Sequence, residues 1–158
     1  MYHKDIPEEQ QPQGFYTALR NEYGSLDKAS TYEKYADAIF KNTMDHPLRI
    51  DANQGWDTAD NAIRVLQALG PFNIEHCEEP IARHRFMELS RVSAASPIPI
   101  MADESCGDEH DAERLIALRA CAQFNIKLGK SSGFYKGIQI AQLGAAAGMH
   151  MQVGGFMR

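Results

Sequence analysis

Short apolar runs alternate with longer amphipathic stretches from about residue 48 to the end of this chain. The runs have the length of β-strands and are bounded by Gly, Pro, Asn and Asp. In the stretches between them, apolar residues recur every three or four positions, which is the period of a helix with one buried face. Five strands are predicted, over residues 48–51, 74–78, 98–102, 123–128 and 149–153. Helices are predicted over residues 59–69, 86–95, from Asp108 or Asp111 onwards, and from about 135 to 147.

Strands that alternate with helices at this spacing pair in parallel through right-handed crossovers. A doubly wound sheet and a barrel both satisfy the pattern, and the barrel is favoured because every strand ends on a charged or polar residue. No nucleotide-binding glycine pattern follows the first strand. Since an eight-unit barrel typically needs about 250 residues, we expect an α/β fold that is an incomplete (β/α)8 TIM-type barrel. It would hold about five parallel strands with intervening helices and form a piece of a larger enzyme.

The first part of the chain does not follow this alternation. Residues 1–14 are polar and rich in Pro and Gln, which predicts disorder. Residues 30–42 carry aromatic and aliphatic side chains on one face and predict a helix. We therefore expect an N-terminal segment over 1–46, partly disordered and then helical, followed by a partial barrel domain over 47–158.

Composition narrows the classes of function. A formal net charge of −5 gives no electrostatic support for binding to nucleic acid or to a membrane surface. No apolar run is long enough to span a bilayer, and the first residues lack the order of a signal peptide. Three cysteines form neither a Cys-x-x-Cys pair nor an even set, so we expect reduced thiols. A cytoplasmic protein with neither nucleic-acid nor membrane partners is the resulting expectation.

Four predicted strands end on a charged residue: Asp51, Glu78, Asp103 and Lys127, at intervals of 27, 25 and 24 residues. Since the carboxyl ends of parallel strands meet at one edge of a sheet, three carboxylates and one amine come together there. Taken singly, each acid is a common helix cap or solvated loop residue, and Lys127 a common surface lysine. Four in register favour a functional site. The loop Lys130-Ser-Ser-Gly133 fits ordinary turn chemistry at least as well as an anion site.

The residue types point to one chemistry. Neighbouring strands lie about 4.8 Å apart, so the three carboxylates would repel one another unless a cation joined them. Oxygen ligands without Cys or His select a hard ion such as Mg²⁺. Lys127, partly buried beside that ion, is expected to have a lowered pKa and to act as a general base on a proton next to a substrate carboxylate. Glu79 adjoins Glu78, and strand spacing alone does not choose between the two.

Five motifs in this part of the chain resemble the enolase superfamily. The resemblance covers residues 47–157, in order and at matching spacing. Within the muconate-lactonizing subgroup the motifs look most like those of dipeptide epimerases such as L-Ala-D/L-Glu epimerase. As a set they are highly specific for the superfamily, whereas for the exact substrate they are only suggestive. The motifs are Arg49-Ile-Asp-Ala-Asn-Gln-Gly-Trp56, Glu78-Glu-Pro80, Met101-Ala-Asp-Glu-Ser105, Asn125-Ile-Lys-Leu-Gly-Lys130 and Gln152-Val-Gly-Gly-Phe-Met157.

The resemblance implies roles for individual residues. The family's Mg²⁺ ligands map onto Asp51, Glu78 and Asp103, so that the first glutamate of the Glu-Glu-Pro triplet is the ligand. One of the two acid/base lysines maps onto Lys127. The implied substrate is a small carboxylate, in this subgroup a dipeptide, whose C-terminal residue loses its α-proton from one face and regains one on the other.

The sequence also departs from the family. The second catalytic lysine belongs to a Lys-x-Lys motif, which occurs nowhere in these residues. Residues 1–46 do not resemble the family's capping domain or first two strands. In the family, Gly-Gly-Phe-Met is followed by Glu-Ser, where Arg158 stands here. Since epimerisation needs a base on each face, we expect a truncated and impaired form of the enzyme.

Two other hypotheses remain open at this point. One keeps the superfamily but changes the reaction, to a cycloisomerase or an o-succinylbenzoate synthase. The other is a non-catalytic remnant whose exposed edge strands pair in a homo-oligomer.

Overall fold

The computed structural model describes residues 47–155 of the chain. They form one sheet of five strands, in which the spatial order follows the chain and every neighbouring pair is parallel. The strands are β1 (Leu48–Asp51), β2 (Ile74–Glu78), β3 (Ile100–Ala102), β4 (Gln123–Lys127) and β5 (His150–Gly154). The disorder expected over 1–14 and the helix expected over 30–42 lie outside the described residues. The domain boundary after residue 46 stays a prediction.

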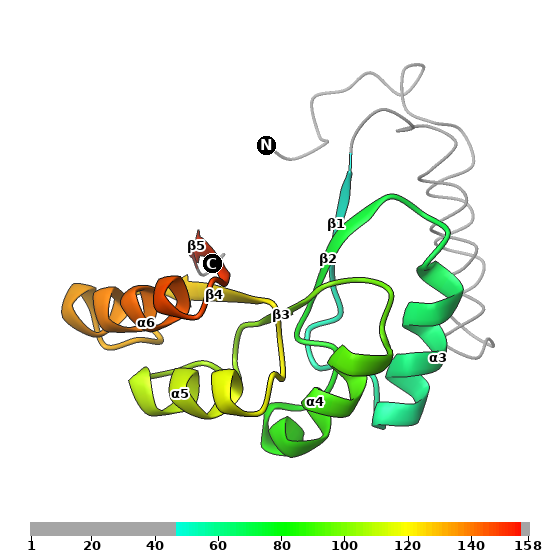
Figure 1. Ribbon diagram of the computed structural model, residues 1–158, viewed down its shortest axis with the longest axis horizontal. Helices are drawn as coiled ribbons and strands as arrows, with labels where there is room; N and C mark the ends of the chain where they lie inside the picture. The colour runs from blue at the N-terminus through cyan, green and yellow to red at the C-terminus, as the bar shows by residue number, and fades with distance from the viewer. Residues whose placement is uncertain (1–46, 156–158) are drawn as a thin grey trace, which may run out of the picture. The chain divides into compact units, whose positions relative to one another are not determined.

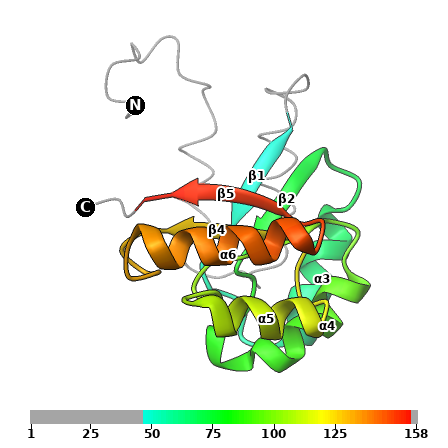
Figure 2. The same cartoon turned by 60° about the vertical axis from the view of Figure 1, so that its left-hand side comes forward.

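Helices connect the successive strands and follow one another in an arc along one face of the sheet (Figure 1), and the turned view shows the same face covered (Figure 2). They are α3 (Ala59–Leu69), α4 (Phe86–Ala95), α5 (Glu109–Ala117) and α6 (Phe134–Ala146), with a short 3-10 helix, η3 (Arg83–Arg85), before α4. Sequential parallel strands with helices on the outside form a half-barrel, which confirms the predicted incomplete TIM-type barrel. Of the helices described, none combines the length and apolarity that a membrane crossing requires.

Local signals in the sequence account for helix α3. Thr58 is its N-cap, as its hydroxyl oxygen accepts the Asn61 N–H at 3.2 Å. The apolar residues spaced three and four apart turn one face of α3 inward. Those buried are Ala59, Ala62, Val65, Leu66 and Leu69. The predicted bounds of this helix are confirmed, because a good cap and a regular apolar stripe agree there.

Other boundaries differ slightly from the predictions. Strand β3 begins at Ile100 rather than at residue 98. Pro99 has no N–H to give to a sheet ladder, although its carbonyl accepts the Cys77 N–H at 2.9 Å. The sequence left Asp108 and Asp111 open as the start of α5. The N-cap is Asp108, whose carboxylate accepts the Asp111 N–H at 2.9 Å.

The packing of α6 on the sheet fixes which way the strand residues face. A Cβ on Gly144 would lie 2.8 Å from Met151 Sδ and 3.3 Å from a ring carbon of Phe124, so glycine lets the helix approach β4 and β5 without displacing these two side chains. Phe124 and Ile126 are buried on this side. Since side chains alternate along a strand, Asn125 and Lys127 point to the opposite, inner face of the half-barrel.

The cysteines agree with the expectation of reduced thiols. Cys77, Cys106 and Cys121 are all free and buried. Burial raises the pKa of Cys106 and of Cys121 to about 12. Small buried thiols of this kind serve packing rather than chemistry.

Replacing Leu66 with alanine tests the core under α3. Leu66 is fully buried, so Leu66→Ala should lower the free energy of unfolding by about 2–5 kcal/mol. Ile138→Ala is the matched control, because Ile138 is 56% exposed on α6 and should cost less than about 0.5 kcal/mol. Urea unfolding followed by circular dichroism measures both, and equal losses would contradict the packing described.

Candidate active site

The strand register brings the four predicted residues to one edge of the sheet. Asp51 and Glu78 are direct partners across β1 and β2. Glu78 is paired with Met101, which lies two residues before Asp103. Lys127 is the last residue of β4, the neighbour of β3. All four therefore lie at the carboxyl end of the half-barrel, as their spacing predicted.

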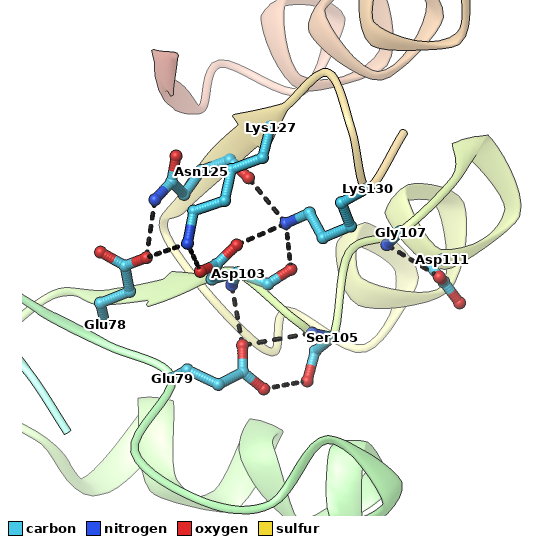
Figure 3. Close-up of polar contacts among 9 residues, drawn as sticks. All are labelled: Glu78, Glu79, Asp103, Ser105, Gly107, Asp111, Asn125, Lys127 and Lys130. Carbon is cyan, nitrogen blue, oxygen red and sulfur yellow. Dashed lines mark hydrogen bonds and ion pairs between the residues drawn. The ribbon is translucent and has the colours of Figure 1, made fainter. Parts of the chain in front are cut away.

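Three of these residues are in direct contact. The ammonium of Lys127 points between two carboxylates (Figure 3), forming an ion pair with Asp103 and lying 3.8 Å from Oε1 of Glu78. The side chain of Asp103 is 2% exposed, and those of Glu78 and Lys127 are 10% and 14% exposed. A buried amine between two buried acids is costly to form without mutual pairing, so this arrangement marks a site rather than a solvated loop.

Asp51 stands at the margin of this group. Asp51 is exposed, and its Oδ1 accepts the N–H of Asn53 at 2.8 Å. Asn53 has a positive φ of 46°, in the left-handed region. The carboxylate of Asp51 thus closes the turn after β1 as well as standing beside Glu78.

The two adjacent glutamates have different tasks. Glu79 has a φ of 36°, which turns it off the strand and away from Glu78 (Figure 3). Its fully buried carboxylate accepts the N–H groups of Asp103 at 2.7 Å and Ser105 at 3.2 Å, together with the Ser105 hydroxyl. Only Glu78 faces Lys127, whereas Glu79 braces the loop after β3.

Asn125 belongs to the site, although the sequence reasoning did not single it out. Its Nδ2 donates to Oε1 of Glu78 at 2.6 Å. A side chain on Gly154 of the next strand would overlap the Asn125 amide, so glycine there leaves room for it. Asn125 lies two residues before Lys127 on the same strand face, and this period-two spacing could have revealed it.

Lys130 was also missed, since its loop was interpreted as a turn or an anion site. Its ammonium turns back to the strand edge, where it pairs with Oδ1 of Asp103 at 2.6 Å. It also donates to the main-chain carbonyl of Asn125 at 2.9 Å and to that of Asp103. Two lysines therefore meet one aspartate.

The surroundings shift the pKa values of the two buried acids in opposite directions. Burial, together with the nearby charges of Asp103 and Asp51, raises the pKa of Glu78 to about 7. Burial also acts to raise the pKa of Asp103, but hydrogen bonds from Lys127 and Lys130 outweigh it and hold that pKa below its ordinary value. Glu78 thus holds its proton more tightly than Asp103 does.

Without a bound cation the pKa of Lys127 is raised rather than lowered, and the lowering expected beside an ion stays a prediction. Burial does act to lower this pKa, but the hydrogen bond and charge of Asp103, followed by the charges of Glu78 and Glu104, outweigh burial and raise the pKa. The expectation gave a neighbouring divalent cation the larger effect. Here the neighbours of Lys127 are carboxylates, which favour its charged form.

The donor set fits a hard divalent cation in its chemistry. Glu78 and Asp103 are buried oxygen donors at the ends of neighbouring strands. The pKa of Glu78 is raised first by burial and then by the negative charges of Asp51 and Asp103, which a cation would offset. Within residues 47–155, no three His, Cys, Asp or Glu side chains already converge to hold a metal ion. The roles given to Asp51, Glu78, Asp103 and Lys127 accordingly stay predictions.

Known proteins share both the sequence and the fold. A D-Ala-D/L-Ala epimerase from Cytophaga hutchinsonii is 52% identical over 110 residues, which are 70% of this chain and 30% of that enzyme. Muconate cycloisomerase 1 from Pseudomonas putida is 39% identical over 107 residues, 68% of this chain and 28% of its own length. The crystal structure of a dipeptide epimerase from Cytophaga hutchinsonii, complexed with Mg and the dipeptide D-Ala-L-Val, superposes with a TM-score of 0.79 at 45% identity. That match covers 81% of this chain and 35% of the solved one.

The chain thus spans about a third of the length of the proteins it matches. Its curated relatives include epimerases, a racemase and a cycloisomerase, and the epimerases and the cycloisomerase agree with the resemblance that the five motifs indicated. The model of the family described as enolase C-terminal domain-like matches residues 12–157. It begins well before residue 47, where the motifs start, so the similarity also takes in most of the N-terminal segment. This chain belongs to the enolase C-terminal domain-like family.

Proposed function

We propose that this chain carries the central part of an Mg²⁺-dependent active site that removes a proton from the carbon next to a carboxylate. The observation that carries the proposal is the buried contact of Lys127 with Glu78 and Asp103 at the carboxyl edge of the half-barrel. Active sites of α/β barrels lie at this edge. An amine held beside oxygen donors for a hard cation is the pair of groups that such a reaction needs.

Each residue has one task in this proposal. Asp51, Glu78 and Asp103 hold the ion through their carboxylate oxygens. When bound, the ion would stabilise the negative charge that develops on the substrate carboxylate as the proton leaves. Lys127 takes the α-proton in its neutral form, which a cation bound to Glu78 and Asp103 would favour by offsetting the charges that now raise the lysine pKa. Asn125 keeps Oε1 of Glu78 in place through its hydrogen bond.

A dipeptide is the substrate class that the comparisons favour. The relative with 52% identity is a D-Ala-D/L-Ala epimerase, and others are L-Ala-D/L-Glu and hydrophobic dipeptide epimerases. A cycloisomerase is the second candidate, favoured by the relative from Pseudomonas putida at 39% identity. The higher identity places the dipeptide hypothesis first.

Among residues 47–155, which the structure describes, the proposed base is Lys127. The 158 residues contain no Lys-x-Lys motif, and Lys127 reaches the substrate from one face. We therefore propose that this polypeptide by itself exchanges the α-proton without inverting the carbon. It is in that sense an impaired form of an epimerase.

Metal addition should stabilise the fold. At a Mg²⁺ concentration 100 times the dissociation constant, binding should raise the free energy of unfolding by about 2.7 kcal/mol relative to EDTA. Asp51→Asn, Glu78→Gln and Asp103→Asn should each reduce this gain. Asp60→Asn is the control, since that exposed acid pairs with Arg91 on α4. Chemical unfolding with and without Mg²⁺ measures the gain, and a wild-type chain indifferent to Mg²⁺ and Mn²⁺ would refute the metal site.

The raised pKa of Glu78 beside Asp103 should make the free energy of unfolding depend on pH when no metal is bound. Folded Glu78 titrates near pH 7, against an ordinary value of 4.5. Between these values the folded state holds a proton that the unfolded state has lost, so its contribution to stability falls as pH rises through that window. Glu78→Gln removes this loss and should therefore gain stability relative to wild type from pH 4.5 to pH 7 in EDTA.

Urea unfolding at a series of pH values measures that difference. Glu113→Gln, on the exposed side of α5, should track the wild type throughout. A constant gap between Glu78→Gln and wild type across the window would show that Glu78 titrates normally.

Proton exchange tests the chemistry directly. In ²H₂O with Mg²⁺ and L-Ala-L-Glu or D-Ala-L-Ala, the chain should incorporate one deuterium at the α-carbon of the C-terminal residue without forming the other epimer. Lys127→Ala should abolish exchange, whereas Lys136→Ala, which alters an ion pair with Glu109, should retain it. Mass spectrometry and chiral chromatography distinguish the products. Epimer formation would refute the one-base proposal, and absence of exchange with any dipeptide would favour a non-catalytic remnant.

A further inference from the structure

The ammonium of Lys130 is saturated by protein acceptors. It has three N–H donors, and three oxygens receive them: Oδ1 of Asp103 at 2.6 Å, the Asp103 carbonyl, and the Asn125 carbonyl at 2.9 Å. Its side chain is 12% exposed. Two of the acceptors are main-chain carbonyls, that of Asn125 in β4 and that of Asp103 directly after β3, so the position of the ammonium is tied to the backbone at the sheet edge.

This anchoring separates Lys130 from Lys127 (Figure 3). The ammonium of Lys127 contacts two side-chain carboxylates at the strand ends, those of Glu78 and Asp103. Lys130 gives up two main-chain hydrogen bonds if it moves, and its own N–H donates to the Lys127 carbonyl at 2.9 Å in a tight turn.

The carboxylate of Asp103 is divided between the two amines. Oδ1 accepts from Lys130 and Oδ2 from Lys127. On the other side of the loop, Glu79 holds the N–H of Asp103 at 2.7 Å. Asp103 is thus fixed at its amide, its carbonyl and one carboxylate oxygen, and only Oδ2 faces the site.

We propose that Lys130 is a positioning residue, which holds Oδ1 of Asp103 so that Oδ2 is presented to the cation of the active site. This rests on the metal site proposed above. Hydrogen-bond partners of metal ligands orient them, and losing one typically costs about 10- to 100-fold in metal affinity. Lys130 does not touch substrate and transfers no proton in this scheme.

The sign of the effect separates positioning from simple charge. If Lys130 acted only as a positive charge, its removal would strengthen cation binding, because one repulsive charge near the metal would be gone. If it positions Asp103, its removal frees the carboxylate to rotate and weakens binding. The two roles therefore predict opposite changes for the same substitution.

Mn²⁺ affinity of the full 158-residue chain, measured by electron paramagnetic resonance, provides the test. Lys130→Met should bind Mn²⁺ about 10- to 100-fold more weakly than wild type. In the double variant Lys130→Met/Asp103→Asn, Mn²⁺ affinity should be little lower than in Asp103→Asn alone, because Lys130 acts on the metal only by holding the Asp103 carboxylate. Lys136→Met, on the outer helix α6, is the matched control and should bind as wild type does.

Lys130→Arg keeps the charge but replaces a compact three-donor ammonium with a planar fork. It should bind Mn²⁺ more weakly than wild type at a similar melting temperature, and it decides the question if Lys130→Met does not fold. Equal or tighter binding by the folded Lys130→Met variant would overturn the inference alone. Absence of Mn²⁺ binding by the wild type would instead overturn the proposed metal site, and the positioning role with it.

Discussion

The negative charge buried on Asp103 is the constraint on which the carboxyl edge of this half-barrel depends. Its side chain is 2% exposed, and an uncompensated carboxylate at that depth would cost several kcal/mol. Two ammonium groups and the backbone N–H held by Glu79 account for the local arrangement. The turn after β4 and the loop after β3 are therefore shaped around one carboxylate.

This arrangement is better explained by chemistry than by stability. Buried ion pairs are often no more stable than apolar residues of the same size. Three ionisable side chains, Glu78, Asp103 and Lys127, nevertheless share one small volume at the strand ends. A cluster of charges with perturbed pKa values is what an acid/base site needs. The geometry supports the proposed reaction class.

The helix-covered face of the sheet makes this possible. Gly144 lets α6 pack on Phe124, which turns the alternate residues Asn125 and Lys127 toward the inner face. Apolar contacts on one side thus orient the polar residues on the other. The side chains on one face of these strands form the core, and those on the other face form the site.

Much of this was predictable because the signals are local. Thr58 and Asp108 cap their helices through contacts three residues away, and each strand end recurs after one strand and one helix. Parallel pairing then places Asp51, Glu78, Asp103 and Lys127 at one edge. Where a local signal was overlooked, as with Pro99, the strand boundary moved by two residues.

The sequence by itself therefore determined the order of the elements, the half-barrel topology and the edge at which the charges gather. Strand spacing left open which glutamate faces the site, and the family resemblance pointed to Glu78. Only the tertiary structure gave the physical reason, which is the left-handed backbone that turns Glu79 away. Likewise, Lys130 meets Asp103 across 27 residues of chain. No helical or strand period encodes such a contact, since it exists only once two loops have been folded against each other.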